Sequence, residues 1–275
     1  MASKTQIQDA LRAMEREEEI RILLAVESGS RAWGFESANS DYDVRFIYVR
    51  PPSWYLSIKP RRDVVERPLM GDLDFSGWDL PKALELFRKS NPPLLEWLQS
   101  PVTYLEDEIF TGKIRALMPD YFSPVASRHH YLNMAANTVK AHLLGETVCL
   151  KKYFYALRPM LACLWIERGM GVVPMEFSKL LRVIADNAPL VRAIENLQEQ
   201  KRAGCELDNA PKIKIISEFL ETHLTRITAA HEPPAFTRDT QPLDDLFIAT
   251  LVRVYGNLIR KPRTIREEIY VSHDD

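Results

Sequence analysis

The chain of 275 residues has few cysteines, no excess of either charge and no long hydrophobic run. Its three cysteines are far apart and form no Cys-x-x-Cys pair, which argues against a zinc site or a disulfide framework. Lysine and arginine number 36 against 38 aspartate and glutamate, so the broad positive charge of many nucleic-acid-binding proteins is missing. The apolar run at 22–26 is too short to cross a membrane, and no signal peptide precedes it. We therefore expect a cytoplasmic protein without a membrane partner.

What the sequence does contain is ordinary core-forming material in two patterns. Hydrophobic residues make up 46% of the chain and charged residues 27%, which is typical of a globular protein. Apolar and β-branched runs indicate strands at 20–26, 44–49, 63–69 and around 73–76. Helical periodicity indicates helices at 5–18, 80–89, 124–144, 151–168, 175–185, 187–203, 211–228 and 242–259. The expected class is α+β, with a mixed sheet and flanking helices in a domain at 1–115 and an all-helical domain at 116–275.

The first expected strand leads into a sequence suited to holding phosphate. The run 20–26 is apolar throughout, as in a strand buried on both faces, and it stops at Ser28-Gly29-Ser30. Glycine lets the backbone approach a ligand closely, and backbone amides beside a hydroxyl can hold phosphate oxygens. A short helix at 30–35 would follow. Gly29 and Ser30 are therefore candidate phosphate-binding residues.

Two carboxylates precede the second strand. Asp41 and Asp43 are two positions apart, and side chains at that spacing share one face of a strand. Two like charges so close repel each other unless a cation lies between them. Oxygen ligands suit Mg²⁺. A phosphate loop beside a carboxylate pair is the equipment for nucleotidyl transfer, in which metal ions hold the attacking and leaving oxygens.

That chemistry calls for a third carboxylate on a neighbouring strand. Asp74, between Leu73 and Phe75, is the best candidate. Asp72 has the same facing parity and remains an alternative as a solvated position at the strand edge. Asp79 is interpreted as a helix N-cap, because Leu80-Pro81 follow it.

Three blocks of sequence carry a family resemblance. They are ESGSRAWGFESANSDYDVRFIYVRP at 27–51, SGWDLPKALELFRKSNPPLLEWLQSPVTY at 76–104 and KKYFYALRP at 151–159. Gly29-Ser30, Asp41-Tyr42-Asp43 and an Asp flanked by apolar residues at 74 resemble the signature of DNA polymerase β-type nucleotidyltransferases. The blocks together resemble the predicted nucleotidyltransferases labelled RNA repair pathway DNA polymerase β family. The resemblance covers roughly residues 20–170.

The resemblance implies a role for each matching position. Gly29 and Ser30 match the loop that binds the β- and γ-phosphates of a nucleoside triphosphate. Asp41, Asp43 and Asp74 match the catalytic carboxylates that hold two Mg²⁺ ions, and Asp74 also acts as, or positions, the base. Lys152 and Tyr155 lie on a helix of the second domain. By analogy with related enzymes, the resemblance implies that these two residues bind the nucleotide.

Several interpretations stay open at this stage. Lys152 and Arg158 also fit an exposed helix stripe, Tyr155 also fits the core, and Arg31 fits either phosphate or solvent. The family label implies an RNA 3′ end as the acceptor. Transfer to a protein hydroxyl or to a small molecule are alternative reactions. A nucleotide-binding regulator without catalysis is the rival from another class, although three converging carboxylates argue against it.

Overall fold

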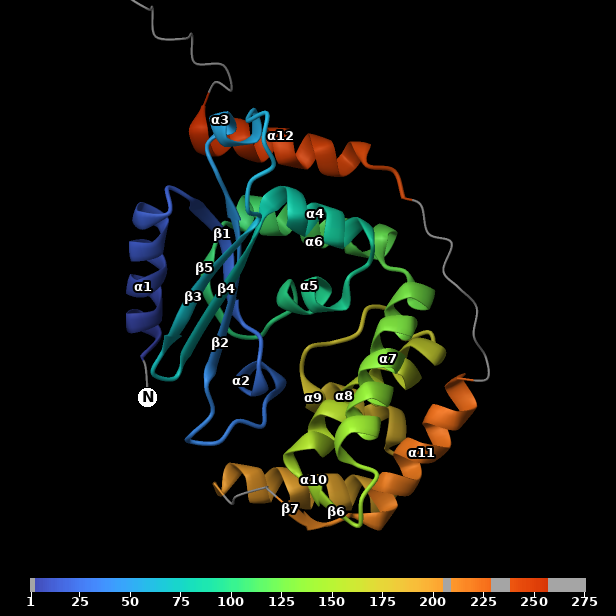
Figure 1. Cartoon of the computed structure of the whole chain (residues 1–275). Coiled ribbons are helices and arrows are strands. Elements are labelled where there is room, and N and C mark those ends of the chain that lie inside the picture. The colour runs from blue at the N-terminus through green and yellow to red at the C-terminus, as the bar shows by residue number, and fades with distance from the viewer. Residues whose placement is uncertain (1–2, 205–208, 229–237, 257–275) are drawn as a thin grey trace, which may run out of the picture.

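The computed structural model describes residues 3–204, 209–228 and 238–256. Five strands form one mixed sheet in the order β3-β4-β2-β1-β5 (Figure 1). Only β2 and β4 pair in parallel, while the other neighbours are antiparallel. The strands are β1 (Arg21–Glu27), β2 (Tyr42–Val49), β3 (Val64–Met70), β4 (Leu73–Asp79) and β5 (Thr103–Glu106). The expected α+β class and mixed sheet are confirmed.

Helices cover both faces of this sheet (Figure 1). The amphipathic helix α1 (Lys4–Glu17) buries Ile7, Leu11 and Met14 against one face. The other face packs on α4 (Leu80–Arg88), α5 (Pro92–Trp97), α6 (Glu108–Tyr121) and α12 (Gln241–Tyr255). With cover on both faces, β1 and β2 need apolar side chains at consecutive positions, as their sequences have.

Helix α4 begins where the sequence indicates. Asp79 caps it, and its Oδ1 accepts a hydrogen bond from the Leu80 amide at 2.8 Å. The same oxygen accepts a hydrogen bond from the Tyr55 hydroxyl at 2.6 Å. Burial raises the pKa of Asp79 to about 6. Asp79 therefore lies at the other end of β4 from Asp74. It is the N-cap of α4, as expected.

The second half of the chain is mainly helical and has its own apolar core. Its elements are α7 (Pro124–His142), α8 (Lys151–Glu167), α9 (Phe177–Leu180), α10 (Ala188–Arg202) and α11 (Lys214–Thr228). The expected helix at 175–185 is the short α9 continued by a 3-10 turn at Leu181–Ile184. An antiparallel ribbon of β6 (Thr147–Cys149) and β7 (Asn209–Pro211) was not expected. In the described residues, no helix has the length and apolarity needed to span a membrane.

The two parts meet through buried polar contacts. Arg158 of α8 donates to the Glu96 carboxylate of α5 at 2.8 Å, and the Tyr131 hydroxyl of α7 donates to it at 2.5 Å. Arg158 is thus an internal ion-pair partner, not part of an exposed stripe.

Helix α12 returns to the sheet after the chain has passed through the helical part (Figure 1). The hydroxyl of Tyr255 donates to the carbonyl of Val49 at 3.0 Å. The expected boundary near residue 115 falls inside α6, so the division into 1–115 and 116–275 stays a prediction. Residues 257–259, the end of the helix expected at 242–259, lie outside the described residues.

Candidate active site

A short loop after β1 forms the base of a pocket. Gly29 and Ser30 line it, and Ser30 begins the single-turn helix α2 (Ser30–Trp33). A Cβ placed on Gly29 would lie 1.7 Å from Oδ2 of Asp43, well inside contact distance. Glycine is therefore required here because the loop backbone passes directly against the carboxylate of the next strand.

A buried glutamate fixes the spacing between this loop and β2. Oε1 of Glu27 accepts hydrogen bonds from the Asp43 amide at 2.8 Å and the Gly29 amide at 3.4 Å. Its Oε2 accepts a hydrogen bond from the Tyr104 hydroxyl at 2.6 Å. Burial raises the pKa of Glu27, and these donors oppose that rise. We did not predict this role from the sequence, although a charged residue ending an apolar strand is a signal for it.

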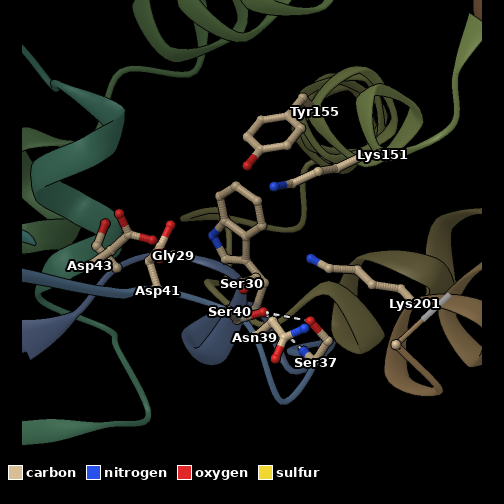
Figure 2. A pocket seen from close by; sticks show the side chains of 13 residues that line it. Gly29, Ser30, Ser37, Asn39, Ser40, Asp41, Asp43, Lys151, Tyr155 and Lys201 are labelled. Carbon is tan, nitrogen blue, oxygen red and sulfur yellow. Dashed lines mark hydrogen bonds between the residues drawn. The ribbon is translucent and has the colours of Figure 1, made fainter. Parts of the chain in front are cut away.

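Asp41 lies on a loop that Arg31 holds in place. The Arg31 guanidinium donates to the carbonyl oxygens of Ser40 at 2.6 Å and Asp41 at 3.3 Å. Its Cζ also lies 3.8 Å from the centroid of the Tyr42 ring. Arg31 therefore supports the carboxylate loop. The carboxylates of Asp41 and Asp43 line the pocket from this side (Figure 2).

Asp74 lies beside Asp43, as the strand pattern predicts. The two residues are direct partners in the parallel pairing of β2 with β4, whereas Asp72 precedes the strand. The side chain of Arg45 lies between the two carboxylates. Its Nη2 is 2.6 Å from Oδ2 of Asp74 and 3.3 Å from Oδ1 of Asp43. Arg45 was missed from sequence, although it is two positions after Asp43 and so shares its face.

Negative charge accumulates around Asp43. Burial raises the pKa of Asp43, and the charges of Asp74 and Asp41 raise it further against the opposing charges of Arg45 and Lys151. Mg²⁺ is commonly held by one or two carboxylates together with substrate phosphates, so Asp41 and Asp43 fit one such ion. Within the described residues, no three acidic, histidine or cysteine side chains are arranged to hold a metal. Asp74 contacts Arg45 and is not among the residues that line the pocket, so a metal or catalytic role for all three carboxylates stays a prediction.

The facing wall comes from the helical part. Lys151 and Tyr155 of α8 and Lys201 of α10 line the pocket opposite Asp41 and Asp43 (Figure 2). The Lys201 ammonium lies 4.5 Å from the centroid of the Phe35 ring. Burial and the nearby charge of Lys151 lower the pKa of Lys201 to about 8. The pocket has a volume of about 440 Å³, within the range of small-molecule sites.

Of the two residues of the helical part that were expected at the site, one lines the pocket and the other does not. Tyr155 lines the pocket, and its ring packs at a steep angle to that of Trp33, with 5.7 Å between the ring centroids. Lys152 is not among the lining residues; its ammonium lies 5.2 Å from the centroid of the Tyr155 ring. Lys151, one position earlier, faces the pocket instead. Binding of nucleotide by Lys152 stays a prediction that this geometry does not favour. Lys151 and Lys201 were missed because their position depends on how α8 and α10 pack.

The comparison with known families matches residues 3–249 to the RNA repair pathway DNA polymerase beta family. The chain belongs to this family. It is 48% identical over 254 residues to a protein of Bacillus subtilis (strain 168) named "Uncharacterized protein YcgL", covering 92% of this chain and 98% of that one. The resemblance seen in the sequence is thus confirmed, and the chain is a nucleotidyltransferase-like protein.

One solved structure can be aligned with the chain over most of its length. It is a nucleotidyltransferase-like protein from Exiguobacterium sibiricum 255-15, with 14% sequence identity over 90% of each chain. The TM-score is 0.28, which is too low to compare individual site residues. The assignment of site residues therefore depends on the geometry of this chain.

Proposed function

We propose that the protein transfers a nucleoside monophosphate from a nucleoside triphosphate to an acceptor hydroxyl and releases pyrophosphate. One observation carries the proposal: a pocket with the Asp41 and Asp43 carboxylates on one wall and the Lys151 and Lys201 ammonium groups on the other. A triphosphate is an anion that binds metal ions. It therefore needs cationic side chains along its length and a cation at the carboxylates.

The loop and the two lysines would hold the triphosphate. Gly29 presents backbone to the pocket with no side chain over it, and Ser30 adds a hydroxyl donor. Lys151 and Lys201 would donate charge-assisted hydrogen bonds to phosphate oxygens. Tyr155 offers an aromatic face and a hydroxyl beside Lys151 for the ribose or base.

A Mg²⁺ ion held by Asp41 and Asp43 would supply positive charge to the triphosphate oxygens. In the reaction, the acceptor oxygen attacks the α-phosphorus while the bond from that phosphorus to the pyrophosphate oxygen breaks. The proton of the acceptor hydroxyl passes to Oδ1 of Asp74, since Oδ2 accepts a hydrogen bond from Arg45. The pyrophosphate leaves toward the lysine wall, where its charge is balanced.

The acceptor class we propose is the 3′ hydroxyl of RNA. The family description supports it, because that description names an RNA repair pathway. The net charge of −2 adds no support for RNA as the acceptor. Transfer to a protein hydroxyl is the alternative reaction, and the experiment must distinguish it from transfer to RNA. The nucleotide preference is a second unknown that the same experiment resolves.

The test uses the full chain with each of the four α-³²P-labelled nucleoside triphosphates and Mg²⁺. The acceptors are RNA with a free 3′ hydroxyl, the same RNA with a 3′ phosphate, and cell protein extract. We expect label on the free 3′ end alone and a loss of about 100- to 1,000-fold in Asp43→Asn, because an essential charge is removed. Label on protein would replace the RNA proposal.

The matched control is Asp63→Asn. This carboxylate pairs with Lys82 at 3.0 Å on the exposed surface and is not among the pocket residues. It should transfer like the wild type. Near-normal transfer by Asp43→Asn, or no transfer and no triphosphate binding by the wild type, would overturn the proposed function.

A further inference from the structure

We propose that Arg45 provides the positive charge between Asp43 and Asp74, so that the site binds a single divalent cation, at Asp41 and Asp43. This inference rests on the proposed function. It departs from the two-ion arrangement that the family resemblance implies. The guanidinium occupies the position between Asp43 and Asp74, on the side where the acceptor hydroxyl would bind. A second ion would otherwise bind there.

The placement of Arg45 is fixed by four hydrogen bonds. Nη2 donates to Oδ2 of Asp74 at 2.6 Å and to Oδ1 of Asp43 at 3.3 Å. Nη1 donates to the carbonyl oxygens of Asp74 at 3.1 Å and Val44 at 3.2 Å. Only 20% of the side chain is exposed. A guanidinium held by both carboxylates and by the backbone of both strands is a built part of the sheet.

The strand pairing explains why a positive charge is needed there. Asp43 and Asp74 are direct neighbours in a parallel pairing, so their carboxylates point to the same face of the sheet. Two ionised carboxylates this close repel each other unless a cation separates them. Arginine is charged throughout the physiological pH range and presents donors that match carboxylates. Arg45 therefore satisfies both charges before any ligand binds.

A second metal ion would have to compete with this arrangement. An ion shared by Asp43 and Asp74 would require Arg45 to give up its contact with Oδ2 of Asp74. It would also place a divalent charge beside a fixed monovalent one of the same sign, at a distance where repulsion is strong. The Asp41 side of the site differs, because Arg31 binds the carbonyl oxygen of Asp41 and its carboxylate faces the pocket.

The first measurement counts metal ions in the wild-type protein. The full chain is equilibrated by dialysis with Mn²⁺ and the α,β-methylene analogues of ATP, GTP, CTP and UTP, which cannot release pyrophosphate. Bound Mn²⁺ and bound nucleotide are measured in the same chamber. We expect one Mn²⁺ for each bound nucleotide. Two Mn²⁺ for each nucleotide would overturn the inference while leaving the proposed function intact. A failure to bind any analogue would instead overturn the proposed function.

Variants then test whether Arg45 is the group that excludes the second ion. Arg45→Gln removes the charge and should raise the ratio from one to two. Arg45→Lys keeps a positive charge and should hold the ratio at one. A ratio of one in a folded Arg45→Gln protein, with the wild type also at one, would overturn the role assigned to Arg45. Should Arg45→Gln fail to fold, the wild-type count still decides the number of ions.

Arg67→Gln is the matched control. Arg67 lies on β3 of the same sheet and also contacts two carboxylates, those of Glu17 at 2.6 Å and Glu18 at 3.2 Å. It is not among the residues that line the pocket. Its substitution should leave the Mn²⁺ ratio at one, and a rise in this variant would show that the change in Arg45→Gln is not local.

Discussion

The acidic wall of the pocket comes from one strand of the sheet and the loop that precedes it, whereas the basic wall comes from two helices far apart in sequence. Asp43 and Asp74 are placed by the pairing of β2 with β4, so their positions follow from backbone hydrogen bonds. Lys151 and Lys201 lie on α8 and α10, whose relative position depends on side-chain packing in a separate core. A strand register is fixed to one residue, while a helix face is set by the packing around it. The acidic wall should therefore tolerate less change than the basic one.

Gly29→Ala tests the acidic wall and should have the largest effect of the three tests that compare the two walls. The added Cβ would lie 1.7 Å from Oδ2 of Asp43, so the loop or the carboxylate must move. Displacing a reacting group by about 1 Å costs on the order of 100-fold in rate, which is the loss we expect in nucleotide transfer. Gly112→Ala in α6 is the control, because its Cβ would meet nothing within 4 Å. Equal activity in both variants would show that Asp43 is not held as closely as its contacts indicate.

Lys201→Met tests the basic wall. Losing a charge-assisted hydrogen bond costs about 1.5–3 kcal/mol, so affinity for a non-reacting triphosphate analogue should fall about 10- to 100-fold. Lys151→Met should act similarly, whereas Lys152→Met should change affinity little because Lys152 does not line the pocket. Isothermal titration calorimetry measures all three. A larger loss in Lys152→Met than in Lys151→Met would reverse our choice between the two lysines.

The pH dependence of triphosphate binding is a second test of the basic wall. We expect it to show the smallest of these effects. Lys201 has a pKa lowered to about 8, so it is charged below that pH and loses its proton above it. Affinity for the triphosphate analogue should fall as pH rises, by about tenfold between roughly pH 7 and 9 for a single such proton. Lys201→Met should lack this part of the pH dependence. An identical pH profile in the two proteins would remove Lys201 from the phosphate site.

The sequence was most informative where local geometry decides position. Asp43 and Asp74 lie on strands as the sequence indicates, whereas Asp41 lies on the loop before β2, and the Asp79 cap followed from the residues after it. The choice of Asp74 over Asp72 agrees with the parallel pairing of β2 and β4. These features depend on periodicity within short segments.

The remainder of the site depends on contacts between distant segments. Glu27 accepts a hydrogen bond from the hydroxyl of Tyr104, which is 77 positions away, and the spacing of a motif does not reveal that contact. Lys201 reaches the pocket only because α10 packs near α2, where Arg202 also donates to the Gly34 carbonyl at 2.9 Å. Lys151 and Lys152 are adjacent in the sequence but point in different directions around α8. The sequence alone therefore did not show which of the two faces the pocket. Sequence periodicity gives the face of a helix that is apolar, but not which neighbour that face meets.

The return of α12 to the sheet has a consequence for how the protein can be divided. Leu243, Leu246 and Leu251 of α12 are buried in the same cluster as the helices on that face of the sheet. The half of the molecule that carries the carboxylates is therefore discontinuous in sequence, and the chain passes between the halves twice, before α7 and before α12. An excised fragment ending at residue 121 would expose the surface that α12 covers. A faithful minimal version of the sheet half needs a linker that joins α6 to α12 directly.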